Sequence, residues 1–239
     1  MSNHSLLGIL SCLTCLFLSA CQEKTLNGDL FPQTENMTWH YNASFRAGRV
    51  YSHHKMVITN KNTEFEGEKV ISHQFHNGDI AYYGKNENGV FRIAFYSSSD
   101  GLVKDPDDHF LIHFPLAAGT KWKIRSKPFF LEQSVRKINS GQASLSADLK
   151  INPLFMEYKI SAVNEKITVS AGKYSHCVRI TGTGETTANG PEIGSTKISV
   201  VQTDWYAPGV GLIKSERQEV TDLDWAKSST YTMELDKIY

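Results

Sequence analysis

Cysteine is scarce in this sequence, and its scarcity excludes a fold held together by disulfides. The 239-residue chain has four cysteines, and only Cys177 lies beyond residue 21. The domain therefore has no second cysteine for Cys177 to pair with, and stability must come from packing and from sheet hydrogen bonds. Cys177 lies in an apolar β-like run with Val178 and Ile180, which favours a buried small side chain over a reactive thiol.

Excess charge of either sign is also missing. The chain has 25 Lys and Arg against 25 Asp and Glu, and none of these residues lies in the first 20 positions. A nucleic-acid partner usually requires a basic patch, so we expect none.

Recognisable catalytic motifs are absent. The sequence has no G-x-S-x-G elbow, no H-E-x-x-H pair and no P-loop. We therefore assign no catalytic residue and no cofactor, and we expect a protein that is not an enzyme. A Ser–His–Asp triad is spatial and leaves no sequence signature, so a triad or metal-dependent hydrolase stays as a minor alternative.

Histidines occur in pairs, but their spacing matches no established metal site. On a strand His109 and His113 would share a face, close to Asp105, Asp107 and Asp108, whereas His73 and His76 would not share one. Zinc needs three or four converging ligands, and calcium prefers a fuller alternation of oxygen ligands than this acidic stretch offers. We therefore predict solvent-facing polar residues here, and at His53-His54, with no metal site.

One apolar run stands out near the start of the chain. Ser5–Ala20 has no charged residue and is short for a transmembrane helix, which needs about 20 apolar residues, but typical of a secretory signal segment. It ends in Leu18-Ser19-Ala20-Cys21, which resembles the lipobox of bacterial lipoproteins, in which the cysteine is acylated and becomes the first residue of the mature protein. Cys12 and Cys15 match less well. The lack of Lys or Arg before the run departs from the pattern, and a short N-terminal membrane helix is the alternative.

The lipobox resemblance implies an anchor and a compartment. Each buried methylene contributes about 0.8 kcal/mol, and several acyl chains on Cys21 would hold the protein stably on a membrane. Gln22 follows the cysteine, which favours the outer membrane, facing the periplasm, over retention at the inner one. We therefore divide the chain into a signal peptide (1–20), a lipidated tether (21–29) and a single β-rich domain (30–239).

The rest of the chain alternates β-like runs with turn signals. Tyr158 and Ile160 alternate with Glu157 and Lys159, the period of two expected of a half-buried strand. Turn residues, such as those at 77–79, 86–89, 105–108 and 188–191, separate the runs. The β-prone runs are Met37–Phe45, Arg49–Thr59, Lys69–Phe75, Val90–Ser97, Thr120–Ile124, Glu157–Val169, His176–Thr183, Lys197–Tyr206 and Val210–Val220.

These runs predict an all-β, mainly antiparallel fold: a curved sheet, a sandwich or a half-barrel. Leu131, Val135 and Ile138 have helical spacing and predict the one short helix. Phe31-Pro32 precedes Trp39 by the spacing at which Phe114-Pro115 precedes Trp122. This echo indicates either a turn before a core-facing strand in both places or a duplicated subdomain, and we prefer the first.

Three segments, in this order, resemble a known group of bacterial proteins. They are Leu30–Tyr41, Ile167–Ile180 and Asp204–Ser215, the last reading DWYAPGVGLIKS. The pattern is similar to that of uncharacterised bacterial lipoproteins, the TapB-like proteins and related domains of unknown function. Ser170 departs from the usual Pro. The resemblance implies a β-rich envelope fold and no established chemistry. By their residue types, Trp205, Tyr206, Val210 and Leu212 favour packing over a binding site.

The sequence supports two main functional hypotheses. The first is a non-enzymatic module that binds an apolar or lipid-like ligand at the membrane surface, in a curved sheet rich in aromatic residues. The second is a structural or assembly partner of other envelope proteins, through an exposed sheet edge or an apolar patch. The ligand-binding residues are unknown at this stage.

Overall fold

The computed structural model describes residues 29–48, 50–129, 149–191, 193–223 and 228–239, and in this part the chain is almost entirely β-sheet. Cys21 and the signal segment lie outside the described residues. Among the residues described, no helix has the length and apolar character needed to cross a bilayer. The strands are β1 (Thr38–Ala47), β2 (Val50–Phe65), β3 (Glu68–Phe75), β4 (Ile80–Asn86), β5 (Gly89–Ser97), β6 (Gly101–His113), β7 (Lys121–Ser126), β8 (Lys150–Ile151), β9 (Leu154–Val169), β10 (Gly172–Gly190), β11 (Gly194–Ala207), β12 (Gly211–Thr221) and β13 (Ser228–Ile238).

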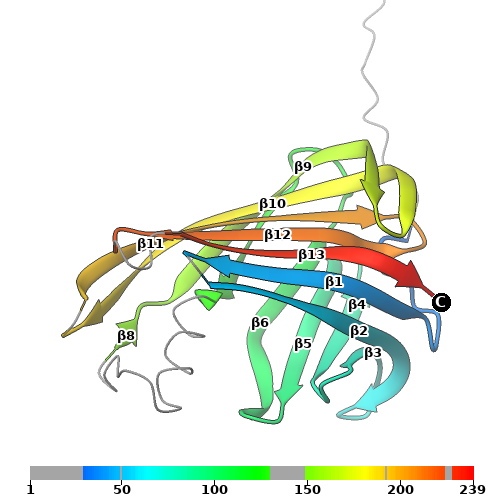
Figure 1. The fold of residues 1–239 in the computed structure, drawn as a ribbon. Helices are drawn as coiled ribbons and strands as arrows, with labels where there is room; N and C mark the ends of the chain where they lie inside the picture. The colour runs from blue at the N-terminus through cyan, green and yellow to red at the C-terminus, as the bar shows by residue number, and fades with distance from the viewer. Residues whose placement is uncertain (1–28, 49, 130–148, 192, 224–227) are drawn as a thin grey trace, which may run out of the picture.

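All of these strands belong to one antiparallel sheet (Figure 1), in the order β6-β5-β4-β3-β2-β1-β13-β12-β11-β10-β9-β7, with β8 paired to β10. Nearly every strand pairs with its neighbour in the chain, as hairpins favour. Strand β7 pairs with β9 and β8 with β10, across short intervals of chain. The long-range exception is the pairing of β1 with β13, which joins the first and last described strands in the middle of the sheet. The sheet is not closed, and its two edges are β6 and β7.

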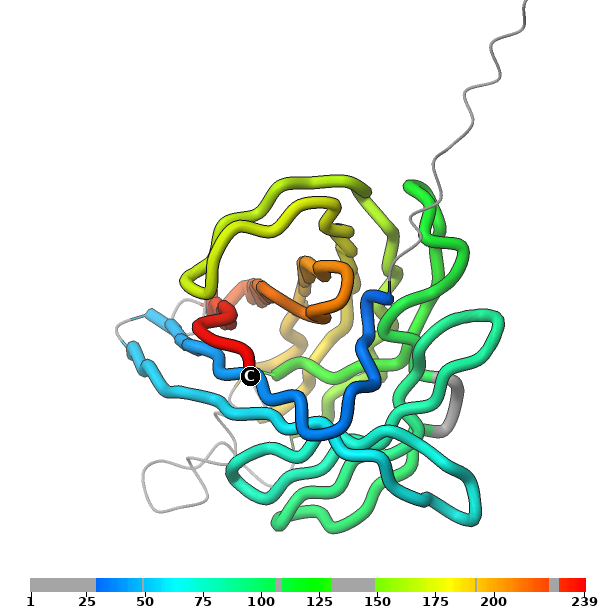
Figure 2. The backbone as a smooth tube through the Cα atoms, turned by 90° about the vertical axis from the view of Figure 1, so that its right-hand side faces the viewer, coloured from blue at the N-terminus to red at the C-terminus, as the bar shows by residue number. Residues whose placement is uncertain are grey.

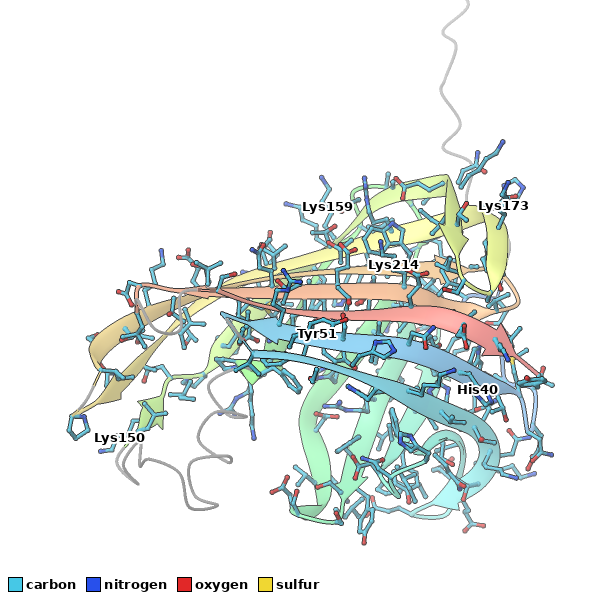
Figure 3. All side chains as sticks on the ribbon, in the orientation of Figure 1. His40, Tyr51, Lys150, Lys159, Lys173 and Lys214 are labelled. Carbon is cyan, nitrogen blue, oxygen red and sulfur yellow. The ribbon has the colours of Figure 1, made fainter. Side chains whose placement is uncertain are left out.

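The sheet curves so that its inner face surrounds a common interior. Figure 2 shows the chain curling around this space. Apolar residues alternate along the strands and point inward; on β9, for example, Leu154, Met156 and Ile160 are fully buried. Residues between them point outward, and Lys159 and Lys173 lie along the top of the molecule in Figure 3. This alternation confirms the period-two prediction for β9.

The two edge strands come close to each other although they do not pair. The indole N–H of Trp122 on β7 donates to the carbonyl of Phe110 on β6 over 2.9 Å. The ring of His113 stacks on Trp122 at 6.0 Å, and Phe114-Pro115, which follows β6, has a cis peptide bond. A side-chain contact thus bridges the gap that backbone pairing leaves open.

The segment before β1 is part of the interior. Leu30 and Phe31 are buried in the larger core cluster. Buried Asn60 donates from its side-chain amide to the carbonyls of Pro32 and Thr34, at 3.4 and 2.9 Å. The path of the chain from the N-terminal side is therefore fixed by the core before the first strand starts.

The predicted all-β class is confirmed, in its curved-sheet form. The predicted β-prone runs fall largely within strands, and both Trp39 and Trp122 are core-facing residues at strand starts, as the preferred interpretation of the echo expects. Four strands, β4, β6, β8 and β13, were not predicted. The predicted helix at Leu131, Val135 and Ile138 lies outside the described residues.

The loop predicted at Asp105-Pro106-Asp107-Asp108 is wrong, because β6 runs through these residues. Their backbone has no partner on β5, since the register passes from Arg92–His109 directly to Ala94–Lys104. Proline has no N–H to donate and is tolerated on an edge strand or at a bulge. Because β6 is both an edge and irregular here, turn-like residues fit inside it.

Candidate functional site

Four buried tyrosines from four different strands form a cluster on the inner face of the sheet. They are Tyr41 on β1, Tyr83 on β4, Tyr158 on β9 and Tyr206 on β11, and we call them the tyrosine cluster. The pKa of Tyr206 lies well above its ordinary value, first because of burial and then because of the negative charges that Asp204 and the other three phenols would carry. Tyr83, Tyr158 and Tyr206 belong to the larger core cluster, and Tyr41 belongs to the smaller one.

The hydroxyl groups of the cluster differ in their hydrogen bonding. Tyr41 donates to the carbonyl of Leu212 over 2.8 Å. Tyr83, Tyr158 and Tyr206 have no hydrogen-bond partner in the part of the chain that the structure describes. None of these three hydroxyl oxygens is among the fully buried side-chain atoms that lack a partner in the described residues, which are on Asn60, His73, Glu165 and Arg179.

This difference predicts unequal effects for two conservative substitutions. Tyr41→Phe is expected to lower the free energy of unfolding by about 1 kcal/mol, because it leaves the Leu212 carbonyl without its donor. Tyr206→Phe is expected to leave the free energy of unfolding nearly unchanged, since its hydroxyl makes no hydrogen bond within the described residues. Urea denaturation of both variants measures the effects. Equal losses in the two variants would contradict the assignment of partners.

Local sequence explains the position of Tyr158. It faces Gly182 on the neighbouring strand β10, and a Cβ atom there would lie 2.5 Å from a carbon of the tyrosine ring. The absence of a side chain at Gly182 lets the ring lie flat over β10. On its other side the ring stacks on Trp122 at 5.7 Å. The ring is thus held between a glycine and a tryptophan.

A buried carboxyl group lies beside the cluster. Asp204 accepts hydrogen bonds from the hydroxyl of Ser215 at 2.6 Å and from the amide of Gln202 at 3.0 Å. Burial raises the pKa of Asp204 to about 6, although these hydrogen bonds and the charge of Arg217 oppose the shift. Asp204 is therefore an anion at neutral pH, with no ion-pair partner at salt-bridge distance among the described residues.

Two ion pairs lie on different strands of the sheet, one largely buried and one half-buried. On β12, Arg217 donates to Glu219 over 2.8 Å and also to the side chain of Gln202. Between β5 and β6, Arg92 makes two hydrogen bonds to Asp105, at 2.7 and 2.9 Å. Burial alone would lower the pKa of Arg92, but the contacts with Asp105 raise it overall. Both pairs satisfy their own charges.

The histidines that sequence analysis singled out do not converge. His109 lies 3.7 Å from Asp105, and burial together with Arg92 lowers its pKa to about 4. His113 instead contacts the carbonyl of Phe114 over 2.7 Å. No group of three or more metal-ligating side chains occurs within the described ranges. His53, His54 and His76 are exposed.

His73 also lies away from solvent, in an aromatic environment, while His109 and His113 are half-buried. Its ring stacks on Phe31 at 4.9 Å and contacts Trp39 and Tyr83 at 5.2 and 4.8 Å. Its Nε2 atom is buried without a partner, and burial lowers the pKa of the ring to about 4. The prediction of a solvent-facing residue is wrong here, because the N-terminal segment covers the ring.

Cys177 is fully buried, as predicted from its apolar neighbours, and burial raises the pKa of its thiol. The Asp204–Ser215 segment also packs as predicted, with Tyr206 in the core. Sequence reasoning missed Tyr83, Arg92 and Arg217 as site residues. The signal that points to Asp204 is its position two residues before Tyr206, which places a carboxylate on the core face of a strand.

The arrangement offers hydrogen-bond donors among the largely apolar side chains of the inner face. The three phenols without partners can donate to an acceptor oxygen, and the aromatic rings around them can contact an alkyl chain. The ion pairs at either side are already satisfied. This combination of a mostly apolar lining and a few polar groups is typical of sites for small molecules.

Comparisons with known proteins match only part of the chain to a family model. Residues 114–222, which are 109 of the 239, match a family model described as DUF3108-like. The match includes the second and third segments of the resemblance and strands β7 to β12. It confirms the resemblance to domains of unknown function; the finer TapB-like name has no support. A search of curated proteins found no significant match.

Three solved structures share low identity with the chain. The first is a Bacteroides fragilis protein described as exported and as having a YmcC-like fold (16% identity, 87% of this chain and 98% of that chain, TM-score 0.38). The second is described as a lipoprotein, from Parabacteroides distasonis (15%, 89% and 99%, TM-score 0.36). The third is a DUF1329 family protein from Desulfovibrio piger (9%, 86% and 85%, TM-score 0.27).

Proposed function

We propose that this protein is a lipid-anchored, non-enzymatic binding protein of the bacterial envelope, and that its curved sheet takes up an apolar or lipid-like ligand. The anchor is Cys21, and the compartment that Gln22 favours is the periplasmic side of the outer membrane. The observation that supports the binding role is the inner face of the curved sheet, where apolar side chains surround tyrosines whose hydroxyls have no hydrogen-bond partner in the described part of the chain.

The physical argument for a ligand rests on the chemistry of the inner face. Tyr83, Tyr158 and Tyr206 belong to one apolar core cluster, and their hydroxyls have no hydrogen-bond partner among the described residues. A phenol can donate to an acceptor oxygen of another molecule. The apolar lining suits an alkyl chain, since burying each methylene contributes about 0.8 kcal/mol.

A role in assembly is the second candidate, and the edge strand β6 favours it. Leu102 and Val103 are exposed near the start of β6, and Tyr96 lies opposite Leu102 on β5. An unpaired edge with exposed apolar side chains can pair with a strand of another protein. Lys104 and Pro106 in the same strand act against such pairing, so we place this role second.

Mass spectrometry of lipids and proteins that copurify with the membrane-extracted protein tests both candidates. The binding role predicts a lipid-like molecule near one per protein, which is retained when Cys21→Ala removes the anchor. The assembly role predicts a reproducible protein partner without such a ligand. Recovery of neither from both forms of the protein would contradict the proposed function. Acyl chains on wild type but not on Cys21→Ala would establish the anchor.

A further inference from the structure

The segment that precedes β1 lies against the sheet without being one of its strands. We call residues 29–34 the strap, and Figure 2 shows them in dark blue within the curl of the chain. Leu30, Phe31 and Pro32 are three consecutive buried residues, while the residues on either side of them are exposed. The strap precedes every described strand, so it can leave its place without breaking a strand pair.

The sheet holds the strap through the carbonyl groups of the strap's backbone. The N–H of Gly209 donates to the carbonyl of Asp29 over 2.8 Å. The side-chain amide of Asn60 donates to the carbonyls of Pro32 and Thr34, at 3.4 and 2.9 Å. These three acceptors belong to the main chain, so the hydrogen bonds do not depend on the side chains of the strap. Proteins bind extended peptides in the same way, with main-chain hydrogen bonds for affinity and side-chain pockets for specificity.

The side chains of the strap have matching contacts. The ring of Phe31 stacks on His73 at 4.9 Å and meets the ring of Tyr83 edge-on at 5.0 Å. Pro32 lies against the start of β12, 3.4 Å from the position that a Cβ atom on Gly211 would take. The residues of the sheet that contact the strap, which we call the seat, are Asn60, His73, Tyr83, Gly209 and Gly211.

The strap fills the seat imperfectly. Asn60 and His73 lie directly opposite each other on β2 and β3. The Oδ1 atom of Asn60 and the Nε2 atom of His73 are both buried without a hydrogen-bond partner in the described part of the chain. Buried polar atoms are normally paired, so two unpaired atoms beneath one segment require an explanation. They are explained if the strap is an exchangeable occupant, because another segment with a hydroxyl group at this place could satisfy both atoms.

We propose that the seat is a binding groove for an extended polypeptide segment in which an apolar residue, an aromatic residue and a proline follow one another, and that the strap competes for this groove with such a segment of another protein. The strap is then an autoinhibitory contact. This inference goes beyond the proposed function, because uptake of a lipid neither requires nor excludes a peptide in the seat.

The test measures how tightly a copy of the strap binds to protein whose own strap is weakened. The probe is a fluorescein-labelled peptide with the sequence of residues 27–36, and the parent protein is the full-length chain carrying Cys21→Ala. The parent is expected to bind the probe weakly, because its own strap fills the seat. The strap variant Leu30→Ser, Phe31→Ser is expected to bind the probe about tenfold or more tightly in fluorescence anisotropy.

Three controls establish where and how the probe binds. Phe155→Ser removes a ring that is 60% exposed on β9, outside the seat, and this variant is expected to bind as weakly as the parent. A probe with serine in place of its leucine and phenylalanine is expected to bind neither protein. Asn60→Ala, added to the strap variant, is expected to weaken binding about tenfold, because the donor to two carbonyls of the probe is lost.

The outcomes decide the inference without touching the proposed function. If the folded strap variant binds the probe no more tightly than the parent, or binds the serine probe equally well, the groove is wrong. Phe31→Leu is a milder second variant, which loses the ring over His73 and is expected to bind the probe more tightly than the parent. If circular dichroism shows both strap variants unfolded, the strap is an indispensable part of the core, and the inference fails. Lipid copurification is judged separately from all of these results.

Discussion

Glu219→Ala is expected to lower the free energy of unfolding by about 3–5 kcal/mol. The side chain of Glu219 is 3% exposed and accepts hydrogen bonds from Arg217 and from the backbone N–H of Phe129. The substitution leaves the guanidinium of Arg217, which is 13% exposed, buried without its counter-charge. Removal of one partner of a buried pair costs far more than the pair contributes, because desolvation of the other is no longer compensated. Urea denaturation measures the change.

The same strand provides a matched control. Glu216 on β12 pairs with Lys214 at 2.8 Å, but its side chain is 44% exposed. Glu216→Ala is therefore expected to cost less than about 1 kcal/mol. The double variant Arg217→Ala, Glu219→Ala is expected to lose less than the sum of the two single losses, since neither charge is then left alone. Similar small losses for Glu216→Ala and Glu219→Ala would show that the buried pair is not a structural requirement.

Asp204→Asn is expected to stabilise the protein at pH 7.5, by up to about 3 kcal/mol. The pKa of Asp204 rises from its ordinary value of 3.8 to about 6 on folding, because burial disfavours the carboxylate. Between these values the folded state holds a proton that the unfolded state has released. The contribution of protonated Asp204 to the free energy of unfolding is therefore complete below pH 4 and is lost as the pH rises to about 6. The side-chain amide of the asparagine variant cannot ionise, and its oxygen can still accept the hydrogen bond from the amide of Gln202.

The comparison must be made as a difference between the two proteins. His73 and His109 have pKa values lowered to about 4, so they have the opposite effect and add stability as pH rises from about 4 to 6.5. Both are present in wild type and variant and cancel in the difference. Thermal or urea unfolding from pH 4 to 8 should show an advantage of the asparagine variant that grows up to pH 6 and then stays constant. A loss of stability independent of pH would mean that Asp204 acts mainly as a hydrogen-bond acceptor.

Local strand structure could be predicted from the sequence where alternation was regular. Trp122 and Ile124 face the core on β7, with Lys121 and Lys123 outside, as the pattern indicates. Strand β6 was missed because its acidic residues and Pro106 have turn-like chemistry that only an irregular edge strand accommodates. The β1–β13 pairing could not be predicted, since no local signal marks two strands that meet across nearly the whole chain.

The candidate site depends on this long-range pairing, and this explains why it was not found from the sequence. Alternation identified Tyr158 as a core-facing residue, and the resemblance drew attention to Tyr206. Nothing in the sequence reports whether a phenol has a partner, because that depends on which other strands face it. Tyr83 on β4 and Tyr206 on β11 share one core cluster only because the sheet joins β1 to β13 and curves.

The meeting of the first and last strands in mid-sheet has a consequence for the order of synthesis. The chain forms two runs of hairpins, β1 to β6 and β7 to β13, and each can zip locally as it leaves the ribosome. Strand β1, however, must wait with one side unpaired until β13 has been made. An unpaired strand edge invites pairing with other chains. One edge of β1 in the nascent protein thus stays unpaired for almost the whole of translation. The two halves of the sheet, β1 to β6 and β7 to β13, are natural units for domain swapping between copies of the protein.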